Sequence, residues 1–458
     1  MAALLLVVYL LTMAPTLSWS HYGADGGDLV RAVARGSIPH PPGFPTYLLL
    51  GDLFIRLPLR NPAWRLNLMS GVAAAGAAGL VASTVQRLQL RLPRVSALCA
   101  GLALGLAPLF WSQALITEVY TLAAFCGAVV VLLVLHGAPE WMRGIVWGLG
   151  LGVHPTLMFL VPVVFCDAFK ETGWSARIGT VARVGLAALP GWGAMVGPVL
   201  LARNGAASPW ADVRTLDGWW GLVSGRLYRG YVFALPLAAW PPRILAWAGL
   251  LARQFTPAGA LLAGIGWLAL WRERRGLAAS SLASFGGFGI YALGYDTADS
   301  LVYLVPALPL AGLWLGLGVD RAVDWLQERL TRAGREAAGR CSPALALLIP
   351  LFQALLFWGG MDLSGDRAAM AWAGRTLEEA PPDAVLLTRS DAHTFTLWYA
   401  CDVLGRGPDV VVIDRDLWFQ EPYRGQIAAQ LELGTVGPSL SAEEAARRAG
   451  RPVVSATE

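Results

Sequence analysis

Long uncharged stretches dominate the hydrophobic pattern of this chain. Each stretch is about 20 residues long, which is the length that an α-helix needs to cross the hydrocarbon core of a bilayer. Short polar loops separate them, and charged residues become frequent only after residue 361. We predict membrane helices close to residues 2–19, 66–86, 95–116, 119–138, 144–166, 184–202, 254–271, 276–295, 300–319 and 342–361.

Two of these stretches need interpretation. Residues 2–19 have neither a basic start nor an Ala-x-Ala cleavage site, so we interpret them as a retained helix rather than a signal peptide. Residues 144–166 contain His154-Pro155, and a proline inside an apolar run breaks or kinks a helix. We expect two short helices that form a V with His154 at the tip, which makes about eleven membrane helices in total.

The end of the chain has a different pattern. Residues 384–388 and 410–413 are short runs of β-forming residues, and residues 392–404 and 424–433 have helical patterns. We therefore expect an α-helical polytopic membrane domain over residues 1–361, followed by a small soluble α/β domain over residues 362–458.

Composition supports this division. Charged residues make up 14% of the chain and apolar residues 56%, whereas soluble domains carry about 25% charge, so an ordinary soluble enzyme is excluded. The last 97 residues hold 9 Arg and 15 acidic residues, a net charge of −6, and the preceding residues carry the remaining +10. No dense basic stripe favours a nucleic-acid partner, and no Cys/His spacing indicates zinc.

Arginine and lysine in short loops predict the orientation, because such loops stay cytoplasmic. The short loops rich in these residues all fall on one predicted side, and they are 87–94, 170–183, 272–275 and 320–340. The N-terminus shares that side. The first loop (20–65), the long loop (203–253) and the C-terminal domain are then expected to face outward. The long loop 203–253 on the other side carries six Arg against this rule, so either it is long enough to escape the rule or its Arg residues have a function there.

The first outward loop carries the most informative polar residues. Asp25 and Asp28 are three residues apart, so they can share one face of a helix whose N-terminus favours their ionised form. Such a pair can supply a general base or bind a divalent cation such as Mg²⁺ or Mn²⁺, or it can simply cap the helix. The turn His40-Pro-Pro-Gly43 follows, either as a close approach to a ligand or as a rigid corner.

Other polar residues lie at predicted outward ends of helices. Glu118 faces either the interface or a cavity, and His154 either binds a phosphate or is an ordinary satisfied polar residue. In the long loop, aromatic and arginine residues suit sugar stacking with phosphate binding, or else anchoring at the bilayer interface. The residues concerned are Trp219, Trp220, Arg226, Tyr228 and Arg229.

This one-sided distribution favours an enzyme that acts at the outer leaflet on a phosphate-bearing lipid. A transporter or a binding protein for a lipid-linked substrate, without chemistry, is the alternative. Transporters usually bury polar groups near the bilayer midplane and contain repeated halves, whereas these predicted spans are nearly free of charge and show no repeat.

Several motifs resemble one known family. It comprises multispanning proteins, widespread in bacteria, that include the vertebrate transmembrane protein O-mannosyltransferase, and it belongs to the GT-C class of glycosyltransferases. Its pattern Asp-Ser-Gly-Glu-Leu matches Asp25-Gly-Gly-Asp28-Leu here. Further matching stretches are Ile38-Pro-His40-Pro-Pro-Gly43, Trp111-Ser-Gln113, Glu118-Val-Tyr120, Gly150-Leu-Gly-Val-His154, Trp219-Trp220, Ser224-Gly-Arg226-Leu-Tyr228-Arg229, Tyr303-Leu-Val-Pro306 and, in the tail, Asp391 with Thr394-Phe395.

The resemblance implies a function. GT-C enzymes move a sugar, here with mannose as one candidate, from a polyprenyl-phosphate-sugar to a protein, glycan or lipid acceptor outside the cytoplasm. They typically invert the anomeric centre and use an acid of the first outward loop as base. By position this acid is Asp25, with Asp28 as its partner. The implied location is a bacterial inner membrane with a cytoplasmic N-terminus and a periplasmic C-terminal domain.

Overall fold

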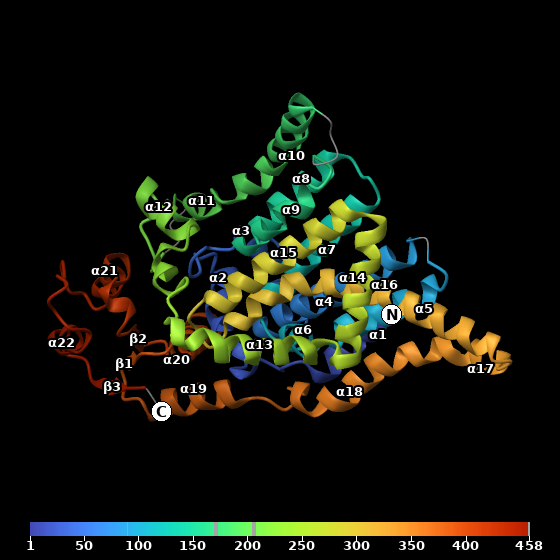
Figure 1. The fold of residues 1–458 in the computed structure, drawn as a ribbon. Helices are drawn as coiled ribbons and strands as arrows, with labels where there is room; N and C mark the ends of the chain where they lie inside the picture. The colour runs from blue at the N-terminus through green and yellow to red at the C-terminus, as the bar shows by residue number, and fades with distance from the viewer. Residues whose placement is uncertain (89, 169–172, 204–207, 457–458) are drawn as a thin grey trace.

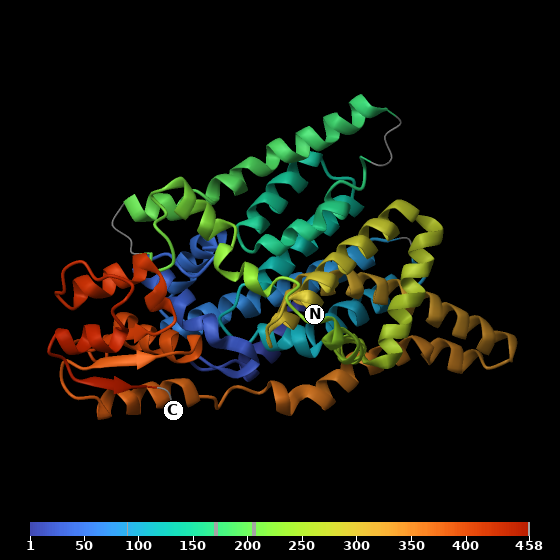
Figure 2. The same cartoon turned by 60° about the vertical axis from the view of Figure 1, so that its left-hand side comes forward.

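A helical body and a smaller α/β unit make up the structure, which is a computed structural model. It describes residues 1–88, 90–168, 173–203 and 208–456, so Lys170 of the predicted basic loop 170–183 lies outside the described residues. The α/β unit lies at one end of the body, and α17 (Glu336–Cys341) lies at the opposite end (Figures 1 and 2).

The helices of the first half of the body are α1 (Ala2–Thr12), η1 (Ser20–Asp25), α2 (Gly26–Arg35), α3 (Pro45–Ile55), α4 (Pro62–Gln86), α5 (Pro93–Gly105), α6 (Pro108–Gln113), α7 (Tyr120–Leu135), α8 (Glu140–Leu151), η2 (Pro155–Leu160), α9 (Val161–Val164), α10 (Trp174–Ala194) and α11 (Gly197–Arg203). Those of the second half are α12 (Leu216–Val223), η3 (Arg226–Tyr231), η4 (Leu237–Ala239), α13 (Trp240–Gln254), α14 (Thr256–Glu273), α15 (Arg275–Gly294), η5 (Ser300–Ala307), α16 (Leu308–Arg332), α17, η6 (Ser342–Leu347) and α18 (Leu348–Met361).

Five helical stretches of the described chain are long and apolar enough to cross a bilayer. They are residues 62–86, 174–202, 275–294, 300–332 and 336–361, and shorter apolar helices such as α7 accompany them. The membrane character expected from the hydrophobic pattern is therefore confirmed. The count of eleven spanning helices stays a prediction.

Two predicted helix boundaries were wrong, and proline explains both of them. Residues 2–19 do not form one helix, because α1 ends at Thr12 and Pro15 follows. Residues 95–116 are divided into α5 and α6 by Pro108, which begins the second helix. The loops 20–65 and 203–253 contain helices of their own, including α3 and α13.

The predicted break at His154 is confirmed. Helix α8 ends at Leu151, His154 has an extended backbone (φ −156°, ψ 131°), and Pro155 starts η2. The indole of Trp147 in α8 donates a hydrogen bond to the carbonyl of Leu157 beyond the break, at 2.9 Å. The two arms therefore pack back against each other and hold His154 at their junction.

Three of the predicted basic loops meet at one end of the body. Arg91 pairs with Asp324 at 2.9 Å, and the backbone N–H of Leu92 donates to Asp320 at 2.8 Å. Arg321 pairs with Glu273 at the end of α14. The structure thus groups loops 87–94, 272–275 and 320–340, as the orientation rule requires.

The α/β unit contains a parallel three-stranded sheet in the order β2-β1-β3. Its elements are α19 (Ala368–Glu379), β1 (Val385–Thr388), α20 (Asp391–Trp398), the π-helical turn η7 (Tyr399–Val403), β2 (Val411–Asp414), η8 (Leu417–Phe419), α21 (Glu421–Gln430), α22 (Ala442–Arg448) and β3 (Val453–Ser455). Strands β1 and β2 and helices α20 and α21 form close to where they were predicted, whereas β3 was missed.

The α/β unit docks on the first outward loop of the body. The Trp19 indole donates to the carbonyl of Ala392 and to the hydroxyl of Thr396. Arg31 of α2 pairs with Asp402 at 2.5 Å and stacks on Trp398, with its guanidinium 4.5 Å from the ring centroid. Helices α2 and α20 approach so closely that only glycine fits at position 27.

We predict that Gly27→Ala destabilises this docking, because the new methyl carbon would lie 2.1 Å from the carbonyl oxygen of Phe395. Overpacking of this kind typically costs about 1–3 kcal/mol. Thermal unfolding and limited proteolysis of the purified protein measure the effect. Gly374→Ala in α19 is the matched control, since nothing lies within 4 Å of its added Cβ. Equal stability of the two variants would contradict the prediction.

Candidate active site

One histidine joins the two aspartates that the sequence singled out. His40 Nδ1 lies 2.8 Å from Asp28 Oδ2, and its other ring nitrogen, Nε2, lies 3.5 Å from Asp25 Oδ2. The backbone N–H of His40 also donates to Asp28 Oδ2, at 2.7 Å. The result is a continuous Asp25–His40–Asp28 chain across the turn and the helix that carry these residues.

The two aspartates differ in exposure. The side chain of Asp28 is 2% exposed and that of Asp25 is 31% exposed. Asp25 occupies the N-cap position of α2, yet its side chain makes no capping hydrogen bond. Capping therefore does not account for Asp25, whose carboxylate stays available at the surface, whereas Asp28 acts through His40.

The local sequence explains how the Asp25–His40–Asp28 arrangement is formed. Helix α2 starts directly after Asp25, so Asp28 lies in its first turn. The chain reverses at His40-Pro-Pro-Gly43, where the N–H of Gly43 donates to the carbonyl of His40 at 2.9 Å. Gly43 has a φ of +87°, which favours glycine. This turn brings His40 back over the beginning of α2.

Electrostatics keeps His40 charged. Burial on its own would lower the pKa of His40, but the carboxylates of Asp25 and Asp28 raise it to about 9. An imidazolium donates from both ring nitrogens, so it can serve both carboxylates at once. Burial raises the pKa of Asp25, and the charge of His40 opposes that rise.

The α/β unit covers the Asp25–His40–Asp28 arrangement on one side. The ring of Phe395 in α20 lies parallel to that of His40, with centroids 6.3 Å apart. Trp210 contacts His40 edge-on at 6.1 Å. Asp391 begins α20, and it is close enough to Asp25, His40 and Asp28 for their charges to act on its carboxyl group. Helix α20 thus brings aromatic cover and a further acid to the site.

A series of rings connects His40 with the V-shaped helix pair. Phe44 lies 4.9 Å from His40 and 6.0 Å from His154, centroid to centroid. His154 in turn contacts Tyr120 at 5.4 Å and Tyr303 at 5.7 Å. The tip of the V therefore belongs to the same side of the body as Asp25.

Hydrogen bonding assigns the proton of His154. The backbone N–H of Thr156 points to His154 Nδ1 at 3.2 Å, and the Thr156 hydroxyl lies 2.7 Å from the same nitrogen. Because a backbone N–H can only donate, Nδ1 is the acceptor and the ring hydrogen is on Nε2. His154 is therefore a neutral ring whose Nε2–H can donate a hydrogen bond, and its binding of a phosphate stays a prediction.

Further acids surround Asp25. Glu118, between α6 and α7, is buried, and burial raises its pKa well above the ordinary range. Asp299, just before η5, acts electrostatically on both Asp25 and Glu118. Tyr228 of η3 is also within range of Asp25, Asp28 and Asp391. The structure thus brings Glu118, Tyr228 and Asp391 toward the Asp25–His40–Asp28 chain.

Four other predicted substrate-binding residues have different surroundings. Arg226 makes a two-pronged pair with Asp217, at 2.7 and 2.9 Å, so its guanidinium is already engaged. Trp219 donates to the carbonyl of Met195, and the Trp220 ring lies 6.1 Å from that of Trp219, tilted by 44°, while half of its surface is exposed. Arg229 is exposed and lies next to Tyr228 in the chain. Of these four, Arg229 is the best placed to meet a ligand.

The sequence also suggested Asp25 and Asp28 as ligands of a divalent cation. The His40 ring lies between Asp25 and Asp28 and contacts both carboxylates, so its single positive charge offsets one of their two negative charges. Among the described residues no group of three or more His, Cys, Asp or Glu side chains is placed to hold a metal ion. Binding of Mg²⁺ or Mn²⁺ by Asp25 and Asp28 stays a prediction.

Some residues of this region were not predicted as site residues. Phe44, Tyr120, Trp210, Asp299, Tyr303 and Phe395 make the contacts described above. Tyr120, Tyr303 and Phe395 belong to the stretches that carried the family resemblance, which was the available signal. Trp210 and Phe44 could not be distinguished from interface aromatics without the tertiary structure.

Comparison with known proteins agrees with this architecture. Residues 25–174 match the family model described as the N-terminal domain of protein O-mannosyl-transferase TMEM260. The mouse protein O-mannosyl-transferase TMEM260 is 25% identical over 450 residues, which cover 91% of this chain and 62% of that protein. The Dictyostelium discoideum protein of the same name is 29% identical over 82 residues, 17% of this chain and 10% of that one. The chain thus spans less than two thirds of the mouse relative.

Solved structures share the fold. The crystal structure of ArnT from Cupriavidus metallidurans bound to undecaprenyl phosphate has a TM-score of 0.57 at 12% identity, covering 96% of this chain and 95% of that one. The apo form gives 0.52 at 14% identity, with 93% coverage of both chains. The chain is therefore an α-helical polytopic membrane protein with the GT-C fold. Within that fold class, residues 25–174 are similar to the N-terminal domain of protein O-mannosyl-transferase TMEM260.

The charged state of His40 predicts a pH-dependent stability. Because its pKa is raised from 6.5 to about 9 by folding, the stabilisation is complete below pH 6.5 and is lost as pH rises through about 9. Its upper limit is about 3 kcal/mol, since one pKa unit corresponds to about 1.4 kcal/mol. Thermal unfolding of the purified protein across this pH range should show the decline.

Asp28→Asn should flatten that decline, because it removes the partner that hydrogen-bonds to His40. Asp52→Asn is the control, since Asp52 is exposed in α3 and pairs only with Arg56 among the described residues. A pH profile of Asp28→Asn identical to that of the wild type would show that this pair does not hold the charge on His40.

Proposed function

We propose that this protein is a membrane glycosyltransferase that moves a sugar from a polyprenyl-phosphate-sugar to a hydroxyl acceptor, with Asp25 as the base. The single observation that carries the proposal is the partly exposed Asp25 carboxylate, held against the His40 imidazolium and free of a capping role. The TMEM260 relatives, named as O-mannosyl-transferases, support the reaction class. The ArnT structure with undecaprenyl phosphate supports a lipid-linked donor.

The chemistry follows from the positions of the charges. Asp25 takes the proton of the acceptor hydroxyl while the acceptor oxygen attacks the anomeric carbon. The bond between that carbon and the phosphate oxygen breaks, inversion results, and the polyprenyl phosphate leaves. Burial raises the pKa of Asp25, which brings it closer to that of an effective base near neutral pH. We assign Arg229 to the departing phosphate, because Arg226 is already paired with Asp217.

The surroundings favour an uncharged ligand part near His154. Tyr120, Tyr303 and Phe44 present ring faces or edges around a neutral Nε2–H donor. Aromatic rings with a single directed donor suit the apolar faces and hydroxyls of a sugar better than they suit a phosphate. We therefore place the transferred sugar between Asp25 and His154, with mannose as the first candidate and a protein hydroxyl as the first acceptor to test.

Asp25→Asn should lower sugar transfer by about 10²–10⁴-fold, which is the usual contribution of a general base. The measurement supplies radiolabelled polyprenyl-phosphate sugars to membranes with and without the protein and identifies the labelled product. Asp52→Asn is the control, because this exposed residue lies in α3, near the same loop, and forms an ion pair with Arg56.

The same assay separates the alternative functions. Full transfer by Asp25→Asn would overturn the assignment of the base. Movement of the lipid-linked sugar across a reconstituted bilayer without any labelled product would favour a transporter instead.

Two substitutions of His154 divide the functions of its two nitrogens. Asparagine keeps an acceptor for the Thr156 N–H but has no group at the Nε2 position, whereas glutamine places an N–H donor close to that position. We expect His154→Asn to raise the KM for the donor by about tenfold, the value of one lost hydrogen bond of ~1.4 kcal/mol. His154→Gln should raise the KM for the donor by less than His154→Asn does. A higher KM for His154→Gln than for His154→Asn would show that donor binding depends on the Nδ1 contact with Thr156 instead.

A further inference from the structure

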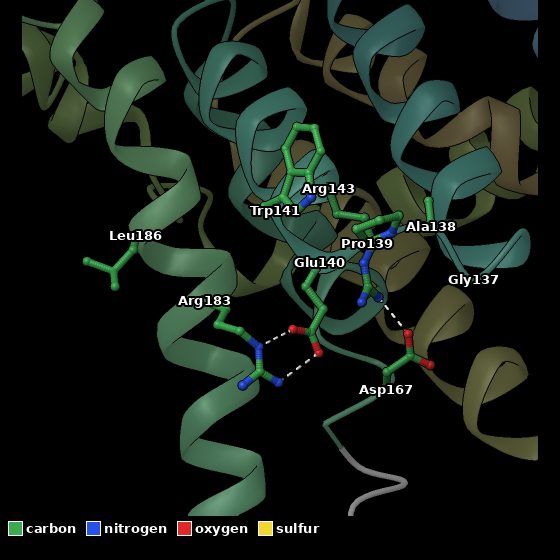
Figure 3. Close-up of a pocket in the computed structure, with 9 residues that line it drawn as sticks. All are labelled: Gly137, Ala138, Pro139, Glu140, Trp141, Arg143, Asp167, Arg183 and Leu186. Atoms are coloured by element: carbon green, nitrogen blue, oxygen red, sulfur yellow. Dashed lines mark hydrogen bonds and ion pairs between the residues drawn. The ribbon is translucent and has the colours of Figure 1, made fainter.

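A cavity of about 640 Å³ lies away from the candidate active site. It opens beyond the C-terminal end of α7, at Gly137, while Tyr120 of the active-site region starts the same helix. A helix of this length separates the two by about 24 Å at a rise of 1.5 Å per residue. Figure 3 shows the lining residues, among which two arginines and two carboxylates stand out.

The four charged groups alternate. Arg143 Nη1 donates to Asp167 at 2.7 Å, and Arg183 makes two hydrogen bonds to Glu140 (Figure 3). The described lining residues therefore carry two positive and two negative charges. A carboxylate can accept up to about four hydrogen bonds, so Glu140 can accept more than the bonds that Arg183 and Thr180 donate to it.

Arg143 provides a second, independent observation. Its side chain is 3% exposed, yet its buried Nε–H has no hydrogen-bond partner. A buried unsatisfied donor of a charged group is costly, and natural proteins usually satisfy it. Arg143 lines the cavity, and an acceptor oxygen that reaches its Nε–H would satisfy this donor.

Exposed apolar side chains also flank the cavity. Helix α10 lies along the outer edge of the molecule and packs mainly on α8 (Figures 1 and 2). Of the most apolar 18 residues in the helical stretch 174–202, only 22% are buried inside the protein. Beside the charged groups, Trp141 is 55% exposed and Leu186 is 65% exposed. A polar cavity flanked by exposed apolar side chains on a spanning helix suits the headgroup level of a bilayer.

We propose that this cavity binds the headgroup of a zwitterionic phospholipid whose amine carries N–H donors, that is, a lipid of the phosphatidylethanolamine class. The phosphate oxygens accept from Arg143 Nε and from Arg183, and the ammonium donates to Glu140 and Asp167. An anionic headgroup would meet the two carboxylates, and a choline headgroup has no N–H to donate to them. The cavity volume is within the range of about 300–1,000 Å³ found for small-molecule sites.

The test uses the full-length protein, purified and delipidated. Native mass spectrometry compares retention of phosphatidylethanolamine, phosphatidylcholine and phosphatidylglycerol with identical acyl chains, supplied in equal amounts. We expect phosphatidylethanolamine to exceed phosphatidylcholine by about tenfold, and Glu140→Gln to bring this ratio close to one. Glu273→Gln is the matched control, since Glu273 pairs with Arg321 at an exposed site outside the cavity lining.

Three outcomes would overturn the proposal. They are equal retention of the ethanolamine and choline lipids by the wild type, preferential retention of phosphatidylglycerol, and an unchanged preference in Glu140→Gln. If Glu140→Gln does not fold, the comparison of the three lipids on the wild type decides alone. The result does not depend on whether the protein transfers a sugar.

Discussion

A single charged histidine between two aspartates organises the region where the helical body meets the α/β unit. Burying an imidazolium is costly unless its charge and both N–H groups are satisfied, and Asp25 and Asp28 meet that requirement together. The turn at Gly43, the start of α2 and the cover by Phe395 are all needed to place His40 there. Asp25 gains a fixed position from the same arrangement and keeps an exposed oxygen.

The α/β unit is part of this arrangement rather than an appendage. It binds the first outward loop through the Trp19 hydrogen bonds and the Arg31–Asp402 pair, and it brings Phe395 and Asp391 to the site. The absence of a side chain at Gly27 allows α20 to approach α2. Residues almost 400 positions apart in the sequence therefore meet in one small region. Weakening the contact between the α/β unit and α2 is expected to disturb His40 as well.

The sequence predicted many of the residues that lie in the site but not the hydrogen-bond partners of each. Asp25, Asp28 and His40 became site candidates because the stretches that carry them resemble a glycosyltransferase family, whereas the residues alone left a cap and a rigid corner open as well. For His154 the sequence left phosphate binding and an ordinary polar role open, and the contact with the Thr156 N–H adds that its ring is neutral. It also grouped Arg226 with Arg229, although Asp217 engages Arg226. Hydrogen-bond partners of this kind do not leave a periodic pattern in a sequence.

The membrane class and the break at His154-Pro155 could be predicted from the sequence alone, because hydrophobic length and proline geometry act locally. Only the tertiary structure decided which acid is exposed and which is enclosed, since Asp25 and Asp28 look alike in the chain and differ through His40. It alone also showed the cavity of Arg143 and Glu140, because burial and orphaned donors are properties of packing rather than of composition.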